Sequence, residues 1–531
     1  MNIEKFCEFD YISKNFLPHT PYGKVYKENL KLITDKKKLE KKYSAIDIFA
    51  DIRKNKRFDY DKIKYHLKNI PYINTAKEVS DITDLFFYKK FLNNYHSIYK
   101  IINKKTKDFF NIIWKYDEAY NLLNIDGYSD TFYISDKYDK RLAELRKSLN
   151  DISKKIEEKK KTFFELIKKE TQLDIDSDFV IVETQKLNDS FNNFFNVEMY
   201  DSSKVVLKPK YPMDYISTIQ EKERLIADEK NIENEIVEKL VKEIEKIRAD
   251  IRLLINSVLD IDIAVSSLEL AIKFNLKRPV FNTTRISFKN GYFLPLKDEL
   301  DTIKIPYTPL NFTFDKRLNV IRGSNMGGKT VALKTLALSQ LMAQYGFFVS
   351  AERFETLIFD DISSVMVESD IKGLSSFAYE IYQFVNIYNS ILDKKVLLIM
   401  DEFARTTGVS EATAIVNSIL SKFNNMKNIY FFMATHLHSI DRLKSLDILR
   451  MKGFDKNSYL KYFDSKTLTD IKEKIKLINK FMDYELIRAS NTDYISSDAL
   501  DISYILGIDK EIYECSKKYM EERNENQETK K

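Results

Sequence analysis

The chain has 531 residues, of which 86 are basic and 80 acidic, a near balance that permits nucleic-acid binding without arguing for it. Hydrophobic residues make up 44% and charged residues 31%, which excludes a disordered protein and predicts a folded, helix-rich one of about two to four domains. Cys7 and Cys515 lie at opposite ends of the chain, which excludes a disulfide framework and a cysteine-based zinc site.

The sequence shows no sign of secretion or membrane insertion. Its first residues, MNIEKFCEFDYISK, lack a basic segment followed by an apolar core, so we expect no signal peptide. No apolar run approaches the ~20 residues that span a bilayer. We therefore expect a cytoplasmic protein without a membrane partner.

The first 137 residues or so are expected to be helical. Aromatic-rich apolar faces recur in segments such as FDYISKNFL, DLFFYKKFL and NIIWKYDEAYNLL. Pro21 and Gly23 interrupt this pattern in HTPYGK, which predicts a turn there.

Two heptad-like stretches follow. Apolar residues alternate spacings of four and three from Tyr138 to about Glu170, and a second helical stretch runs from about Leu225 to Val258. Between them, FVIVETQKL (179–187) has the alternation of a strand, and KPKYP is typical of a turn. This order predicts an antiparallel coiled-coil arm, although a plain helical bundle with a solvated charged face fits the pattern equally well.

After about Arg278, short apolar runs alternate with helical patterns. The runs RLNVIRG, KKVLLIMDEF and NIYFFMATH are typical of buried strands. Strands that alternate with helices predict an α/β domain with a mainly parallel sheet.

The segment GSNMGGKT (323–330) fits the phosphate-binding pattern G-x-x-x-x-G-K-[ST] and stands between an expected strand and an expected helix. Its glycines let backbone N–H groups turn toward phosphate oxygens, and the helix N-terminus adds its positive end. Lys329 is expected to reach the β- and γ-phosphates of ATP, and Thr330 to bind Mg²⁺. The predicted nucleotide-binding residues are Gly323, Ser324, Asn325, Met326, Gly327, Gly328, Lys329 and Thr330.

Two carboxylates follow the apolar run KKVLLIM. Asp401 is expected to hold Mg²⁺ through its water shell, and Glu402 to polarise the attacking water as the general base. The same pair can instead begin a helix as its negatively charged cap. In YFFMATHLH, His436 is a catalytic candidate because a neutral histidine at a strand end can hydrogen-bond a γ-phosphate or water, although such a histidine is more often structural. His438 is interpreted as structural, and no metal site is expected with this pair.

Several segments share their motifs with one family. The family is the MutS family of DNA mismatch-repair ATPases. Its GPNMGGKS loop resembles GSNMGGKT, and its G-x-S-T-F-x-x-E signature resembles KGLSSFAYEI (372–381). Its VLLDEIGRGT segment resembles VLLIMDEFARTT, and its F-A-T-H loop resembles MATH. DIDIAVSSLELA (260–271) resembles that family's connector helix, and EFDYISKNFLPHTPYGK the start of its lever domain. The resemblance covers nearly the whole chain, strongly over 315–440 and weakly elsewhere.

This resemblance implies an ATPase that works as a dimer, here a homodimer. It implies that Asn325 positions the γ-phosphate or the attacking water, and that Ser375 and Ser376 act in trans on the nucleotide of the partner subunit. It also favours the arm over the plain bundle and implies that the arm is a lever and clamp that responds to ATP.

The expected fold is an all-α lever with an antiparallel coiled-coil arm, followed by an α/β P-loop NTPase domain of the ABC type. The expected domains are a helical lever at 1–137, the arm at 138–258 with a short β segment near 179–210, a connector helix at 259–280, the ATPase domain at 281–455 and a C-terminal helical dimerisation region with a frayed tail at 456–531.

The sequence departs from the family pattern at several positions. Ser324 replaces a proline, Ala404 and Thr406 replace glycines of G-R-G-T, and GYFLP stands in place of an R-H-P motif. The resemblance also implies a truncated form, without the family's N-terminal mismatch-recognition domain and without the C-terminal nuclease of its second branch.

Three functions are compatible with these features. The first is an ATP-driven clamp on DNA, mismatch-repair-related or branched, whose candidate phosphate contacts are KPKYP and KKIEEKKK, although solvated coiled-coil charge is the simpler explanation of both. The second is a reactivating chaperone ATPase for an adenosylcobalamin-dependent aminomutase, which binds a protein client and which truncated MutS-like proteins resemble. The third is a nucleotide-binding scaffold without turnover, and the presence of the whole set of catalytic candidates argues against it.

Overall fold

The computed structural model of this chain describes all residues except 1, 130, 283, 324–326, 366–375, 438, 456–457, 460–473, 475–477, 479, 490–497 and 529–531. The described part divides into two compact units, a first unit of Met1–Lys64 with Leu259–Lys531 and a second unit of Tyr65–Val258. Helices α5 (Arg57–Asn69) and α12 (Arg248–Lys273) each run across a boundary between them. None of the described helices is long and apolar enough to cross a membrane.

The main sheet of the first unit has the strand order β13-β12-β7-β11-β10-β9 among the described residues. Neighbouring strands are parallel except β12 and β13, which are antiparallel. The three apolar runs predicted as strands are neighbours, with β11 between β7 and β10. The strands are β7 (Leu318–Arg322), β9 (Asp361–Val365), β10 (Val396–Asp401), β11 (Ile429–Thr435), β12 (Leu446–Phe454) and β13 (Met482–Arg488).

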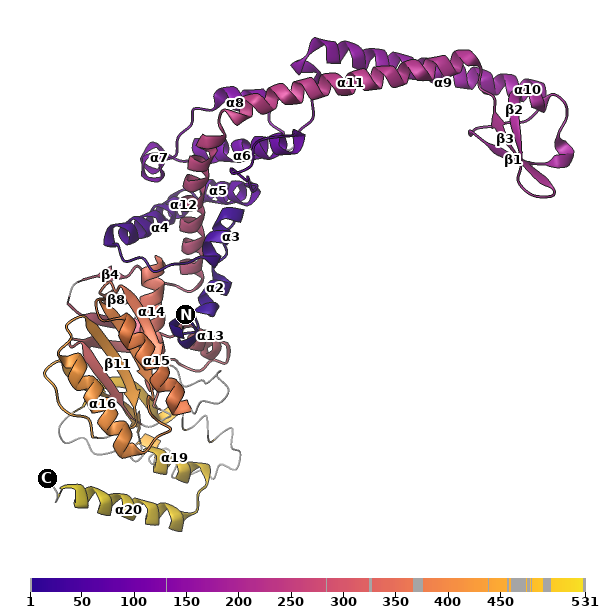
Figure 1. Cartoon of the computed structure of the whole chain (residues 1–531). Helices are drawn as coiled ribbons and strands as arrows, with labels where there is room; N and C mark the ends of the chain where they lie inside the picture. Colours follow the sequence, from indigo (N-terminus) through magenta and orange to yellow (C-terminus); the bar gives the residue numbers. More distant parts are fainter. Residues whose placement is uncertain are drawn as a thin grey trace. The chain divides into compact units, whose positions relative to one another are not determined.

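This sheet is buried on both faces. Val396, Leu398 and Met400 of β10 belong to a core with side chains of α15 (Ser376–Ser390) and α16 (Val409–Asn424), which lie together on one face (Figure 1). The alternate residues of β10 point the other way and are equally buried, and α14 (Lys329–Tyr345) also contacts β10 and β11. Continuous apolar runs are what a doubly covered parallel sheet requires.

The first unit contains a second sheet and further helices. The sheet has the order β4-β8-β5-β6 among the described residues. Its strands are β4 (Val280–Phe281), β5 (Ile286–Gly291), β6 (Leu310–Phe314) and β8 (Arg353–Thr356). The helices are α1 (Asn2–Phe6), α2 (Phe9–Asn15), α3 (Pro21–Glu28), α4 (Lys36–Asn55), α13 (Leu294–Thr302), α19 (Asp498–Leu506) and α20 (Lys510–Glu528).

The turn predicted in HTPYGK is confined to a bend at His19 and Thr20, because helix α3 begins at Pro21. Thr20 caps the helix by accepting a hydrogen bond from the N–H of Gly23 at 2.9 Å. Pro21 occupies the first helical position, where its fixed φ suits the helix and its missing N–H costs nothing. Buried Asp262 of α12 accepts hydrogen bonds from the N–H groups of His19 and Thr20 at 2.9 and 2.8 Å, which fixes the residues that precede the helix.

In the second unit, helices α9 (Lys140–Thr171) and α11 (Met213–Glu245) lie side by side with opposite chain directions (Figure 1). Near one end, Arg146 of α9 binds Glu229 and Glu233 of α11 at 2.7 and 2.6 Å. Further along, Lys159 binds Asp214 at 2.8 Å. The other helices are α6 (Ile82–Ile101), α7 (Lys104–Phe110), α8 (Asp117–Leu123), α10 (Phe191–Phe194) and the 3-10 turns η1 (Asp136–Tyr138) and η2 (Thr184–Lys186).

A small antiparallel sheet, in the order β1-β3-β2, joins α9 to α11. Its strands are β1 (Val180–Glu183), β2 (Phe195–Met199) and β3 (Lys204–Pro209). Val205 and Leu207 pack with Phe163 and Ile167 from the end of α9. The segment FVIVETQKL therefore contributes a strand, as its alternation predicts, and the strand is shorter than the segment.

The stretch from Leu225 to Val258 is not one helix, because α11 ends at Glu245 and α12 begins at Arg248. At the break, the N–H of Ile247 bonds to the carbonyl of Ile244 at 3.1 Å, a tighter turn than an α-helix makes. Arg248 donates to Glu245 at 2.5 Å and to the carbonyl of Thr75 at 3.0 Å. The local bond to Glu245 and the tertiary bond to Thr75 stabilise a break that the apolar spacing does not signal.

Candidate nucleotide-binding site

The phosphate-binding pattern lies where the sequence places it, between strand β7 and helix α14. Gly323 has φ 143° and Gly328 φ 86°, backbone conformations that side-chain-bearing residues rarely adopt. A Cβ on Gly328 would also lie 2.9 Å from Cδ1 of Tyr484. Ser324, Asn325 and Met326 lie outside the described residues. Both glycines therefore have positive φ values, which let the loop backbone turn its N–H groups toward a phosphate.

Lys329 is buried at the first turn of α14. Its Nζ donates to the carbonyl of Gly323 at 2.8 Å and lies 3.9 Å from Oε1 of Glu402. Burial lowers the pKa of Lys329, and the nearby carboxylates of Glu402 and Asp401 oppose that shift. The ammonium group therefore lies at the phosphate loop, where it can donate hydrogen bonds to a phosphate.

Asp401 ends β10 and is paired in register with Ala434 of β11. Burial raises the pKa of Asp401, and a hydrogen bond from Thr330 lowers it only in part. Its Oδ1 is buried with no hydrogen-bond partner among the described residues. The hydroxyl of Thr330 thus lies beside the carboxylate of Asp401, which has an oxygen without a hydrogen-bond partner among the described residues. These two groups fit a Mg²⁺ ion, because Mg²⁺ takes oxygen ligands. The described residues gather no larger metal-binding group, so phosphates and water would supply the remaining ligands.

Glu402 stands just past the strand in a left-handed conformation, with φ 51°. Its N–H donates to the carbonyl of Ala434 at 2.9 Å. Its carboxylate accepts from Nη1 of Arg405 at 2.8 Å. The alternative in which Asp401 and Glu402 cap a helix is wrong, because α16 begins only at Val409, after Gly408.

His436 follows β11 directly and is half-buried. Thr435 of β11 pairs with Arg322 of β7, so His436 emerges at the same edge of the sheet as Gly323 and Glu402. His438 lies outside the described residues. Of the signature serines, Ser375 also lies outside them, whereas Ser376 is the first residue of α15.

A cavity of about 390 Å³ opens beside Lys329 and Thr330. Its other walls are mostly apolar and come from segments far apart in the sequence: Leu296, Leu300, Ile305, Pro306, Tyr307, Leu310, Met451 and Tyr484. A cavity with Lys329 and the start of α14 at one end and mostly apolar walls elsewhere suits a nucleoside triphosphate. Sequence reasoning missed these walls because no local motif marks them.

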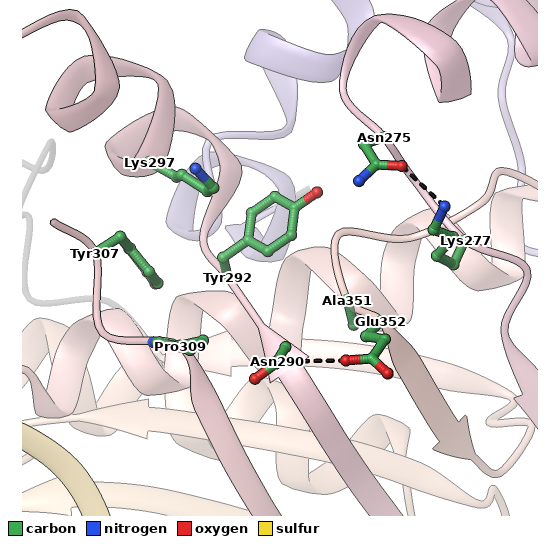
Figure 2. A pocket seen from close by; sticks show the side chains of 9 residues that line it. All are labelled: Asn275, Lys277, Asn290, Tyr292, Lys297, Tyr307, Pro309, Ala351 and Glu352. Carbon is green, nitrogen blue, oxygen red and sulfur yellow. Dashed lines mark hydrogen bonds between the residues drawn. The ribbon is translucent and has the colours of Figure 1, made fainter. Parts of the chain in front are cut away.

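A second cavity, also about 390 Å³, has a different chemistry (Figure 2). Its polar side chains already bind one another or their neighbours: Lys277 donates to Asn275 at 2.8 Å, and Asn290 donates to Glu352 at 2.7 Å. Tyr307 lines both cavities. These polar groups already have partners and none belongs to the phosphate loop, so the first cavity is the candidate nucleotide site.

Known proteins match this same region. Residues 319–462 match the family model described as MutS domain V. The chain is 31% identical over 281 residues to the DNA mismatch repair protein MutS of Flavobacterium psychrophilum, a match that covers 48% of this chain and 32% of that protein. It is 33% identical over 232 residues to the DNA mismatch repair protein MutS of Clostridium novyi, a match that covers 42% of this chain and 24% of that protein. It is 25% identical over 373 residues to the DNA mismatch repair protein MSH3 of Saccharomyces cerevisiae, a match that covers 69% of this chain and 34% of that protein. The chain thus spans about a third or less of the length of these relatives.

Proposed function

We propose that this chain, which belongs to the MutS family, binds ATP with Mg²⁺ and hydrolyses it to ADP and phosphate. The observation that carries the proposal is that Lys329, which lies near the carboxylates of Asp401 and Glu402, lines a mostly apolar cavity of about 390 Å³ together with Thr330. An ATP molecule in this cavity has its triphosphate at the phosphate loop and its adenosine against the apolar walls.

The roles of the residues follow from their positions. Lys329 exchanges its hydrogen bond to the carbonyl of Gly323 for hydrogen bonds to the β- and γ-phosphates, which are stronger because the acceptors are charged. Thr330 and Asp401 hold Mg²⁺, which neutralises charge on the phosphates. Glu402 polarises the attacking water, and His436 and Asn325 position that water or the γ-phosphate. The remaining loop residues, Gly323, Ser324, Met326, Gly327 and Gly328, bind phosphate through their N–H groups.

We further propose that hydrolysis occurs in a homodimer, in which Ser375 and Ser376 contact the nucleotide of the partner subunit. The position of Ser376 at the N-terminus of α15 supports this role, because a helix N-terminus presents free N–H groups to an anion.

The pairing of α9 with α11 supports a coiled-coil arm as the part that responds to ATP. We assign the lever to 1–137, the arm to 138–258, the connector helix to 259–280, the ATPase domain to 281–455 and the dimerisation region to 456–531. The names of the relatives favour DNA as what the clamp binds, whereas the comparisons lend no support to a protein client. We accordingly propose a cytoplasmic clamp on mismatch-repair-related or branched DNA.

The decisive experiment measures binding of the purified protein to duplex and branched DNA at several salt concentrations, with and without ATP. Affinity that changes with nucleotide and falls steeply with salt supports the clamp, because phosphate contacts release counterions. Lys329→Ala is the matched control, since it should abolish ATP binding and with it any nucleotide effect on DNA. Intact ATP turnover without DNA binding even at low salt would refute the DNA clamp while leaving the ATPase proposal in place.

A further inference from the structure

A buried carboxylate, Glu380 of α15, lies against the turn that carries Glu402. Its side chain is 0% exposed, and its Oε2 accepts the N–H of Ala404 at 2.6 Å. Its Oε1 has no hydrogen-bond partner in the part of the chain that the structure describes. Burial raises the pKa of Glu380, opposed by the bond from Ala404 and by the charge of Arg405. A buried carboxyl group with half of its acceptors unused destabilises a fold, so its presence calls for a role.

The turn itself is strained. Glu402 and Ala404 have φ 51° and 63°, in the left-handed region that costs free energy for any residue with a Cβ. Between them, Phe403 is buried, and its ring centroid lies 5.9 Å from that of Phe384 of α15, with the two rings tilted by 54°. Two contacts from α15 thus restrain the turn, the ring of Phe384 and the carboxyl group of Glu380.

We propose that Glu380 is a positioning residue for ATP hydrolysis, which holds the strained turn so that Glu402 faces the phosphate site. The inference rests on the ATPase function proposed above. Helix α15 begins at Ser376, the residue assigned to the nucleotide of the partner subunit. Displacement of this helix therefore moves the acceptor of the Ala404 N–H and, with it, Glu402. Glu380 is the link through which a nucleotide on the partner adjusts the general base of this subunit.

The test compares Glu380→Gln, which keeps a carbonyl acceptor at the same place, with Glu380→Leu, which has a similar volume and no acceptor. For Glu380→Leu, kcat should fall by about ten- to hundredfold, while the dissociation constant of a fluorescent ATP analogue stays within about threefold. Glu380→Gln should keep kcat within about threefold of the wild type. Tyr382→Ala, at an exposed position of the same helix, is the control and should leave kcat unchanged.

A double-mutant cycle with Ala404→Gly separates positioning from folding. Glycine adopts a positive φ without penalty, so the turn needs less restraint in this background. Ala404→Gly should therefore recover at least about threefold of the kcat that Glu380→Leu loses, while changing kcat little by itself. A structural role alone would lower the melting temperature and leave kcat per folded molecule unchanged.

Three results would overturn the inference: unchanged kcat in Glu380→Leu, an equal loss in Glu380→Gln, or strictly additive effects in the cycle. Each of these leaves wild-type ATP turnover intact, so only the role of Glu380 fails. Absence of ATP turnover in the wild type would instead refute the proposed function and this inference together.

Discussion

Replacing Gly23 with alanine would measure how strongly the buried contact between α3 and α12 holds the first unit together. A Cβ at this position would lie 2.2 Å from Oδ2 of Asp262 and 2.6 Å from Cβ of Pro18. Asp262 is 0% exposed and accepts hydrogen bonds from the N–H groups of His19 and Thr20 and from the hydroxyl of Thr20, at 2.9, 2.8 and 2.7 Å. The added methyl group therefore forces this carboxylate to move.

The magnitudes decide the sign of the effect. Gly23 lies within a helix, where alanine is favoured over glycine by about 1 kcal/mol. Against this, a displaced Asp262 loses at least two hydrogen bonds to a charged acceptor, each worth about 1.5–3 kcal/mol. Subtracting the propensity gain leaves a net loss of about 2–5 kcal/mol in the free energy of unfolding. Helix propensity alone predicts that Gly23→Ala raises the free energy of unfolding.

Thermal unfolding followed by circular dichroism is the assay. At about 2 °C per kcal/mol for a large unit, Gly23→Ala should lower the apparent melting temperature by about 4–10 °C. Gly408→Ala is the matched control, because the nearest atom to its Cβ would be Oε2 of Glu411 at 3.7 Å, an ordinary contact. A melting temperature of Gly23→Ala that equals or exceeds that of the wild type would refute the reasoning.

The remaining predictions concern the site and the arm. Tyr484→Ala should weaken ATP binding about tenfold by fluorescence titration, since an aromatic wall of the cavity is lost, and an unchanged affinity would place the nucleoside elsewhere. Glu402→Ala should retain bound ATP while steady-state turnover falls at least ~100-fold, and full turnover would show that another group is the base. Ala404→Gly should raise the free energy of unfolding in urea by about 0.5–1 kcal/mol, and a loss of that size would contradict the strain at φ 63°. Arg146→Ala removes the bonds that α9 makes to Glu229 and Glu233, so hydrogen exchange in α9 and α11 should accelerate by about tenfold or more, whereas unchanged protection would show that these bonds do not stabilise the pair.

The parts of the site that the sequence predicts are those whose residues are contiguous. The phosphate loop, Lys329 and Thr330 fall within eight residues, and the strand before them and the helix after them follow from local apolar patterns. Asp401 and Glu402 follow one apolar run in the same way. Such motifs are predictable because backbone geometry and side-chain chemistry are encoded at the same place.

The walls of the cavity were not predictable, because they depend on the tertiary fold. Ile305 precedes the phosphate loop, whereas Tyr484 follows it on β13, and only the pairing of β13 with β12 at the sheet edge brings the tyrosine to Gly328. The start of α3 depends likewise on Asp262, 242 residues away from Thr20. In both places a distant partner decides the local structure, and no periodicity in the segment reports it.

The turn after β10 is where the local preference of the sequence and the structure disagree most. The related family motif has glycines where this chain has Ala404 and Thr406, yet Ala404 still adopts the left-handed conformation at φ 63°. An alanine keeps such a conformation only if its surroundings over-determine it, and here Glu380, the contact of Phe403 with Phe384 and the carbonyl of Ala434 supply that restraint. Because glycine needs no such restraint, the same turn in a glycine-bearing relative depends less on α15. The alanine therefore makes the position of Glu402, 3.9 Å from Lys329, depend directly on helix α15.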